Sequence, residues 1–417
     1  MQNNKNYSQI VPAENDIRVK SKAICDSKGN YFTLQDSKQR WQSYKNYGVN
    51  FSKVFYMLGA EELDKANKAG KLRVNEKTGE VFVDSEKAKR YFSKSGRMTE
   101  CSLRLGYKVD SDNKKKLHNA LFCRDRLCMI CMWRLSRRLA WETSQIMNKY
   151  MVESPDMIPI MLTLTVRNPK MGELSKMLDV LCHGKSGAWQ LLNKWLVRRG
   201  IKDYTRTLEI TFNHEKRSWH PHLHILTFVP KEYFSKGNKN YISHALLRKE
   251  WKHVCNLDYM PIVDIRRCYD KNSKNERIGF DSDIKTVDFA GAIRETSKYC
   301  VKPLKIFSET LDDYADGGEE TIVKGKIDIK EVVRELDEAL SSRRLRAHGG
   351  KIKTIAKELK FDDDENKKDL LHKDENGTAE AIWEEIYEYV FEDKEYYLTV
   401  RDEIIQEQEK KFDLDTG

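Results

Sequence analysis

Three histidines at alternate positions are the residues of this chain whose types and spacing best suit chemistry. His220, His222 and His224 lie in residues 219–230, WHPHLHILTFVP, which continue as an apolar run. Side chains two positions apart on a β-strand point to the same face, so His222 and His224 would present two imidazoles about 7 Å apart. Two imidazoles and a carboxylate can hold a divalent cation and leave positions open for a substrate phosphate. The alternative is a strand end with structural histidines.

The third ligand is expected from the strand before the histidines. Residues 204–212, YTRTLEITF, alternate as a strand does. A two-residue turn at Lys216 and Arg217 would place Glu209 opposite His224, and directly opposite side chains share a face about 5 Å apart. Glu209 is therefore a candidate metal ligand. A solvated strand carboxylate is the alternative.

A nucleophile is expected on a helix further along the chain. Residues 287–301, VDFAGAIRETSKYCV, follow a helical pattern, and Glu295, Tyr299 and Lys302 share one face of that helix. A tyrosine oxygen can attack a phosphodiester that a metal polarises. Glu295, one turn away, can act as a general base for the tyrosine or for a water. Taken alone, Tyr299 would be interpreted as a surface aromatic residue of the helix.

Four cysteines predict a second metal site. Cys123, Cys128 and Cys131 have the spacing C-x4-C-x2-C, and Cys101 completes four thiolates, with His118 as a substitute ligand. Four protein ligands leave no open position, so a zinc ion here would be structural. Five nearby arginines are expected to stabilise thiolates and to add positive surface: Arg124, Arg126, Arg134, Arg137 and Arg138. Buried or free thiols beside a basic helix are the alternative.

The elements that must position these residues alternate along the chain. Strands are predicted at residues 159–167, 204–212, 219–230 and 261–268, and helices at 173–199, interrupted near 184–187, and at 242–254. The order β-α-β-β-α-β predicts an α+β fold of the ferredoxin-like, split βαβ kind, with an antiparallel sheet and helices on one face.

The charge of the chain is unevenly distributed around a net value of +10. Residues 311–417 hold 18 Lys and Arg against 31 Asp and Glu, a net of −13, and residues 1–310 hold 57 against 34, a net of +23. A positive body of this size predicts a polyanionic partner, because basic side chains neutralise phosphates at several points. A solvated basic surface without a ligand is the alternative.

The sequence has the features of a soluble, cytoplasmic protein with no membrane partner. No apolar run approaches the ~18 residues of a transmembrane helix, and the first residues, MQNNKNYSQI, contain no apolar signal region. The nine cysteines are an odd number, so thiols or metal ligands in a reducing compartment are expected rather than a disulfide framework.

Three motifs in order resemble the rolling-circle replication initiators of small Gram-positive plasmids, which belong to the HUH endonuclease superfamily. They are MLTLT (161–165), HPHLH (220–224) and ETSKYCVKP (295–303). The upstream C-x4-C-x2-C followed by arginines is also similar to this family. The resemblance covers roughly residues 100–305 and is specific as a combination.

The resemblance implies a role for each motif residue. His222 and His224 would be the metal-binding pair, with His220 as a further candidate in the pattern, and Tyr299 the nicking nucleophile. Glu295 would stand where phage-type initiators have a second tyrosine and would activate water at termination. Lys302 would help to hold the scissile phosphate.

The resemblance also implies a reaction and partners. The protein would bind the plasmid double-strand origin, where a hairpin extrudes single-stranded DNA. With Mg²⁺ or Mn²⁺ on the histidine pair, attack would leave a 5′-phosphotyrosyl bond and a 3′-OH that primes the host polymerase. Strand transfer and hydrolysis would end the cycle. A host helicase is an expected partner, and the protein could also form a homo-oligomer.

On this interpretation the chain has four consecutive parts. Residues 1–95 are a basic DNA-binding flank, with helices at 52–70 and 84–95 and a hairpin between them, and residues 96–150 hold the cysteine cluster and a basic helix. Residues 151–310 form the HUH catalytic domain. Residues 311–417 are an acidic, helical C-terminal region, with an amphipathic helix at 327–347. We expect its acidic end to be a solvated helical appendage, although it could also fold onto the basic body or dock a partner.

Two other functions fit parts of the pattern. An HUH transposase would share the chemistry, but the single tyrosine, the Glu four residues before it and the acidic C-terminal region favour the initiator. A mobilisation relaxase normally has its tyrosine before the histidine motif, whereas Tyr299 follows it. The other alternative is a non-catalytic, zinc-containing nucleic-acid-binding protein whose histidines are structural.

Overall fold

The computed structural model describes residues 12–35, 40–74, 81–182, 184, 186–269, 285–297, 328–361, 367–372 and 381–403. The chain divides into two compact units, each assembled from segments far apart in sequence. The first comprises Met1–Val49, Arg97–Cys123 and Leu371–Gly417, and the second comprises Asn50–Gly96 and Arg124–Leu370. Segments that follow one another in the chain therefore do not always belong to the same unit.

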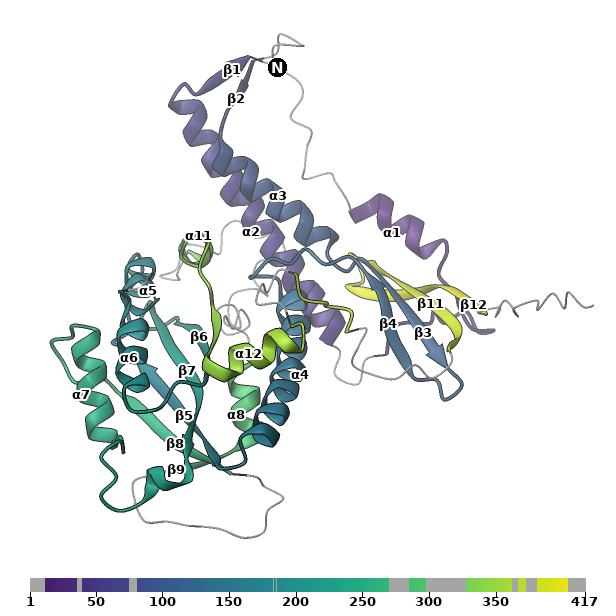
Figure 1. The fold of residues 1–417 in the computed structure, drawn as a ribbon. Coiled ribbons are helices and arrows are strands. Elements are labelled where there is room, and N and C mark those ends of the chain that lie inside the picture. The colour runs from purple at the N-terminus through teal and green to yellow at the C-terminus, as the bar shows by residue number, and fades with distance from the viewer. Residues whose placement is uncertain are drawn as a thin grey trace, which may run out of the picture. The chain divides into compact units, whose positions relative to one another are not determined.

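A six-stranded sheet forms the centre of the second unit (Figure 1). In spatial order its strands are β10 (Arg346–Gly349), β6 (Tyr204–Asn213), β7 (Ser218–Pro230), β5 (Met157–Thr165), β8 (Val263–Tyr269) and β9 (Lys285–Asp288). Neighbours pair antiparallel except β8 and β9, which are parallel. Because β7 is antiparallel to both β5 and β6, those two strands run parallel with β7 between them. The predicted strands and the antiparallel α+β character are confirmed.

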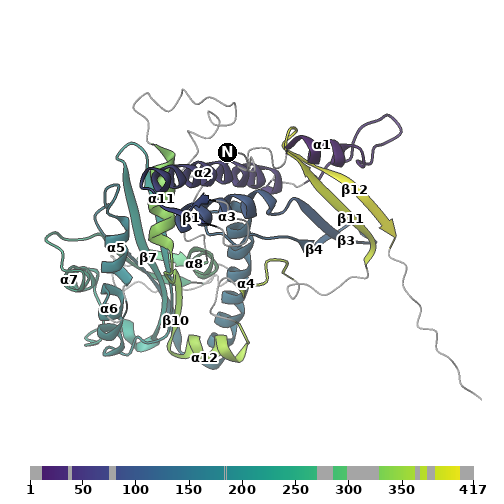
Figure 2. The ribbon, with the colours of Figure 1, turned by 90° about the horizontal axis from the view of Figure 1, so that it is seen from above.

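Helices cover both faces of this sheet (Figures 1 and 2). On one side lie α5 (Leu174–Cys182), α6 (Ala188–Val197) and α7 (His244–Val254), and on the other lie α4 (Met129–Glu153), α8 (Phe289–Thr296) and α12 (Gly350–Glu358). The helices of the predicted β-α-β-β-α-β unit, α5, α6 and α7, therefore share one face as expected, and α4, α8 and α12, which lie outside that unit, cover the other face. The physical reason is visible in β7, where both alternating sets are apolar and buried: Leu223 and Ile225 on one side, Leu226 and Phe228 on the other.

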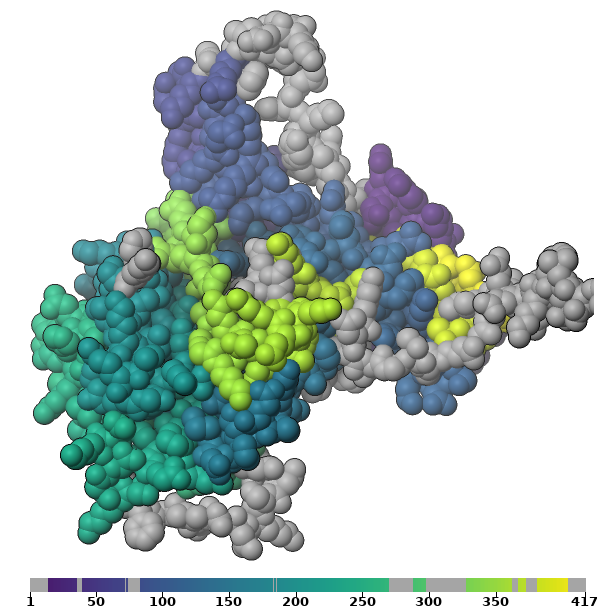
Figure 3. Space-filling view, in the orientation of Figure 1, coloured from purple at the N-terminus to yellow at the C-terminus, as the bar shows by residue number. Residues whose placement is uncertain are grey.

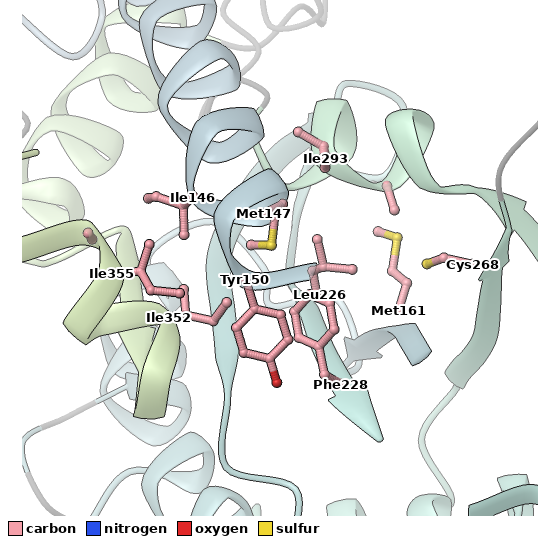
Figure 4. Packing of buried hydrophobic residues seen from close by; sticks show 12 residues of the cluster. Ile146, Met147, Tyr150, Met161, Leu226, Phe228, Cys268, Ile293, Ile352 and Ile355 are labelled. Atoms are coloured by element: carbon pink, nitrogen blue, oxygen red, sulfur yellow. The ribbon is translucent and has the colours of Figure 1, made fainter. Parts of the chain in front are cut away.

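The core on the α4 side is continuous from helix to sheet (Figure 4). Tyr150 of α4 packs on Phe228 of β7, with ring centroids 4.2 Å apart, and Ile352 and Ile355 of α12 join the same cluster. Figure 3 shows α12 at the surface beside α4. The sheet face that carries the even-numbered residues of β7 is therefore packed against these helices.

A helical hairpin precedes the sheet in the chain. It consists of α2 (Arg40–Lys68), β1 (Leu72–Val74), β2 (Val81–Val83) and α3 (Glu86–Glu100). The two predicted helices and the strands of the predicted hairpin are confirmed. The predicted turn between the strands lies outside the described residues. In the second unit Phe55 stacks on Tyr91 at 6.0 Å. The amphipathic pattern of the later segment is also confirmed: α11 (Ile329–Leu340) buries its apolar stripe.

The first unit contradicts the prediction that the acidic end of the C-terminal region is helical. Its sheet has the order β12 (Glu395–Glu403), β11 (Ala381–Val390), β3 (Arg104–Asp110) and β4 (Lys115–Ala120), all antiparallel, with α1 (Pro12–Lys20) beside it. The acidic segment forms strands because Glu alternates with aromatic residues. Tyr387 and Tyr389 are each 2% exposed, and every second side chain can turn into the core only in a strand. Residues 404–417 lie outside the described part.

No helix among the described residues is long and apolar enough to cross a membrane.

Candidate functional site

The strand register brings the predicted histidines and carboxylate into one row. His222 of β7 pairs with Glu209 of β6 on one side and with Thr165 of β5 on the other. The predicted register, which set Glu209 opposite His224, is wrong by two residues. Asn213 pairs with Ser218, so the turn has four residues rather than two. A shift of two leaves every side chain on its predicted face, because the strand period is two.

The three side chains converge. Glu209 Oε2 lies 3.2 Å from His222 Nε2 and 3.0 Å from His224 Nε2. The carboxylate is 2% exposed and the two imidazole side chains 12% and 7%. One ligand atom from each residue lies within 4.8 Å of the others, which is the arrangement of a two-histidine, one-carboxylate cation site. We call Glu209, His222 and His224 the His–Glu group.

The other nitrogen of each ring is engaged, which fits metal ligation. His222 Nδ1 lies 3.3 Å from the carbonyl oxygen of His220, and His224 Nδ1 lies 3.3 Å from Thr163 Oγ1. A carbonyl only accepts, so in this contact Nδ1 of His222 would donate. Nε2 then faces the Glu209 carboxylate with the lone pair that would ligate a metal.

His220 lies next to the His–Glu group but is not part of it. Its ring centroid is 4.9 Å from that of His222, and its Nδ1 lies 2.8 Å from Asn168 Oδ1. Burial, followed by the neighbouring His222, lowers the pKa of the His220 imidazole. His220 thus lies at the edge of the group, on a strand position that shares its face.

A second carboxylate approaches from α8. Glu295 Oε1 is 3.5 Å from His224 Nε2, and its side chain is 28% exposed. The helix begins at Phe289, and the side chain of its N-cap residue, Asp288, accepts a hydrogen bond from the Gly291 N–H. The structure therefore brings Glu295 to the predicted metal-binding pair. Tyr299 and Lys302, which follow it, lie outside the described residues.

The end of α8 is tied to the sheet and to α4. The Thr207 hydroxyl donates to the Thr296 carbonyl oxygen at 2.6 Å. Ser297 Oγ lies 3.2 Å from Thr143 Oγ1, which also accepts a hydrogen bond from Arg346. These buried contacts fix the backbone immediately before the segment that carries Tyr299.

The cysteines form the second group. The sulfur atoms of Cys101, Cys123, Cys128 and Cys131 all lie within 4.8 Å of one another, and all four residues are buried. Backbone N–H groups donate to two of them: Cys123 N–H to Cys101 Sγ at 3.4 Å, and Arg124 N–H to Cys131 Sγ at 3.3 Å. Such bonds favour thiolates. The donor set fits a tetrahedral ion such as zinc.

The other residues expected at the cysteines have different partners. His118 Nε2 lies 2.9 Å from Glu384 Oε1 and is not among the grouped ligands. Arg134 and Arg138 are each 6% exposed, so they add no positive surface. Arg134 donates to the Leu370 carbonyl and Arg138 to Glu142, so both stabilise the fold. A buried guanidinium needs such acceptors, which sequence spacing alone does not reveal.

Comparisons with known proteins decide the family. A family model described as "Replication protein" matches residues 114–397. The chain is 36% identical over 283 residues to the "Protein rep" of Bacillus amyloliquefaciens, covering 66% of this chain and 76% of that protein. It is 30% identical over 293 residues to the "Protein rep" of Streptococcus pneumoniae, covering 69% and 80%. The chain belongs to this family of rolling-circle plasmid replication initiators. No solved structure matches it.

The match to the replication proteins includes the His–Glu group, Glu295 and three of the four grouped cysteines, because only Cys101 precedes residue 114. A "Replication protein" of Staphylococcus aureus is 31% identical over 242 residues, which is 57% of this chain and 89% of that protein. The resemblance seen in the three motifs is thereby confirmed at the level of the family.

Sequence reasoning missed the residues that hold α8. Thr207 could have been found, because it stands two positions before Glu209 on the same strand and therefore shares its face. Thr143 and Arg346 carried no such signal. They come from α4 and β10, about 200 residues apart, and meet only in the folded chain.

Proposed function

We propose that this plasmid replication initiator nicks one strand of the double-strand origin through Tyr299 and leaves a 5′-phosphotyrosyl bond. The observation that supports this most strongly is the His–Glu group on β6 and β7, with Glu295 of α8 3.5 Å from His224. A cation site and a carboxylate therefore lie close together, and the carboxylate, Glu295, precedes Tyr299 by four residues in the sequence. The basic charge of residues 1–310 suits origin DNA as the substrate.

The strand order supports an HUH core of the ferredoxin-like type. In β6-β7-β5-β8, the first and second strands of the β-α-β-β-α-β unit, β5 and β6, run parallel and are separated by the third, β7. That is the split βαβ arrangement. The histidines then lie on the central strand, where both neighbours restrain them.

Glu209, His222 and His224 would hold Mg²⁺ or Mn²⁺. When bound, the ion supplies Lewis-acid polarisation of the scissile phosphate. The imidazole and carboxylate atoms would ligate it, and the part-buried Nδ1 contacts hold the rings in place.

The chain's own residues then carry the strand transfer. Tyr299 Oη would form the bond to phosphorus as the P–O bond to the 3′-oxygen breaks, and that oxygen takes up a proton to become the 3′-OH primer. The phenol proton would pass to a carboxylate, for which Glu295, four residues earlier in the sequence, is the candidate. Lys302 would neutralise a phosphate oxygen. At termination Glu295 would accept a proton from the attacking water, or a 3′-OH would reverse the first step.

The four grouped cysteines would hold a structural Zn²⁺. Support comes from four buried sulfurs with backbone donors and from the lack of an open position in a four-thiolate set. Host polymerase and helicase would act after nicking, in the cytoplasm.

The test is covalent adduct formation. The protein is incubated with Mn²⁺ and labelled single-stranded hairpin oligonucleotides from the plasmid origin and is then resolved on denaturing gels. We expect a protein–DNA band that vanishes in Tyr299→Phe, where only the phenolic oxygen is lost, and in His222→Ala. An adduct that persists in Tyr299→Phe would assign the nucleophile to another residue. Tight DNA binding with no adduct would favour the non-catalytic, zinc-containing protein.

A further inference from the structure

A loop beside the His–Glu group has a fixed backbone. It joins α7 to β8, and Arg248 donates to two of its carbonyls: Nε to Pro261 at 2.7 Å and Nη2 to Met260 at 3.3 Å. Thr165 of β5 donates through Oγ1 to the Ile262 carbonyl at 2.8 Å. Three consecutive carbonyls are therefore satisfied by the fold, and the side chains of this loop project from a rigid support.

The exposed end of this loop shares a sheet face with the His–Glu group. Leu164 pairs with Val263, so the next pair in the antiparallel register is Thr165 with Ile262, and the Thr165 N–H donates to the Ile262 oxygen at 3.2 Å. Thr165 pairs with His222 on its other side. Directly opposite residues share a face about 5 Å apart, which sets Ile262 about 10 Å from His222 on that face. Ile262 is nevertheless 74% exposed.

An arginine stacks on a tyrosine that stands three residues before Ile262 in the same loop. The Arg167 guanidinium lies 4.1 Å from the ring centroid of Tyr259, and the Arg167 backbone N–H donates to the Tyr259 hydroxyl oxygen. The Arg167 side chain is 65% exposed. Asp258 is its carboxylate neighbour at 3.9 Å, and that carboxylate is 82% exposed, so the pair is weak and solvent-screened. The guanidinium therefore keeps an open face and charge for a ligand.

We propose that Arg167, Tyr259 and Ile262 form a stacking platform for unpaired bases of the DNA strand whose phosphate occupies the His–Glu group. The inference rests on the proposed nicking function and extends it to a nucleotide-binding subsite. Aromatic rings and arginine planes stack on bases of any sequence, whereas bases within a duplex are already stacked and unavailable. The open guanidinium favours an anionic chain over a neutral apolar partner.

The test measures binding of fluorescein-labelled dT20 by anisotropy, in the Tyr299→Phe background so that no adduct forms. Base stacking is worth roughly 1–3 kcal/mol per base, so Tyr259→Ala should weaken binding about tenfold, while Tyr259→Phe retains the ring and most of the affinity. Tyr269→Ala is the matched control, since Tyr269 is a 42% exposed tyrosine at the other end of β8. It should leave the affinity unchanged.

A second variant pair does not depend on the tyrosine. Ile262→Asp sets a negative charge on the platform and should weaken dT20 binding about tenfold without affecting the core, because Ile262 is exposed. Val152→Asp, at a position 81% exposed on α4, is its control. Thermal melts of all variants should agree within about 2 °C, and binding to a 20-base-pair duplex should change little.

Two results would overturn the platform. One is dT20 affinity within twofold of the parent for both Tyr259→Ala and Ile262→Asp. The other is unchanged dT20 affinity together with a changed sedimentation coefficient for Ile262→Asp, which would assign the patch to contacts between copies of the chain. If the proposed nicking function were wrong, protein with Tyr299 intact would form no covalent adduct with DNA. The comparison of dT20 affinities does not depend on that result.

Discussion

The His–Glu group and the cysteine group are both sets of potential metal ligands, but they differ in enclosure. The four grouped cysteines are buried and none exceeds 8% exposure. Beside the His–Glu group, Glu295 is 28% exposed and Ile262, in the same cross-strand row, is 74% exposed. A closed set of four ligands suits a structural ion, whereas three ligands with an open side suit an ion that meets substrate.

The two groups also differ in what holds their ligands. Glu209 and His222 are neighbours in a continuous strand ladder, so the backbone supports them whether or not an ion is bound. Cys128 occupies the N-cap position of α4 without a side-chain cap, and Cys123 lies in a non-regular segment. We infer that an ion at the cysteines stabilises the fold and that an ion at the His–Glu group does not.

Cys128→Ser should therefore have the largest effect on stability. Losing one of four thiolates removes most of the affinity for zinc, and binding energy at a structural site is folding energy, so we expect a loss of roughly 5 kcal/mol or more. Zinc content by mass spectrometry and a thermal melt measure it. Cys25→Ser, at an exposed cysteine outside the group, is the control and should melt like the parent. A zinc-free Cys128→Ser protein with the parent melting curve would contradict the comparison.

Glu209→Gln should have the opposite profile. The amide keeps the shape but loses the negative charge between two imidazoles, so Mn²⁺ affinity should fall at least tenfold and nicking by 10² or more at fixed Mn²⁺. The melting curve should change little, since the strand ladder is intact. Adduct formation and Mn²⁺ titration measure the two effects.

Glu215→Gln provides the matched control, because Glu215 is an exposed glutamate in the turn of the same hairpin. It should nick at the parent rate. If Glu209→Gln lowered zinc content instead of Mn²⁺ affinity, the two groups would not be independent.

The faces of the strands could be predicted from the sequence, but their register could not. The two-residue period of a strand places His222, His224 and Glu209 on one face. The predicted register is wrong by two residues, and because this number is even, all three side chains stay on the predicted face. The turn length could not be predicted: the sequence suggests a two-residue turn at Lys216 and Arg217, whereas the Asn213 side chain accepts the Lys216 N–H and closes a four-residue turn. Local patterns determine faces, and turn chemistry determines registers.

The acidic C-terminal segment differs from its prediction because its strand pairing is long-range. Its charge suggested a solvated helix, yet Trp383, Tyr387 and Tyr389 alternate with glutamates as strand residues do. The strand that β11 pairs with besides β12 is β3, which lies more than 250 residues earlier, so no neighbouring sequence indicates this pairing. The composition of this segment fits either a helix or a strand, and pairing with a strand far away in the sequence makes it a strand.

The smallest expected effect concerns the support of α8. Thr207→Val keeps the shape of the side chain but removes the hydroxyl that donates to the Thr296 carbonyl, a contact worth about 1 kcal/mol. The melting temperature should fall by a few degrees, and the nicking rate should fall about tenfold because the segment bearing Tyr299 loses one restraint, while dT20 affinity and Mn²⁺ affinity stay at parent values. Thr207→Ser retains the hydroxyl and should restore the rate. Equal losses in Thr207→Val and Thr207→Ser would mean that packing of the methyl group, rather than the hydrogen bond, positions the helix end.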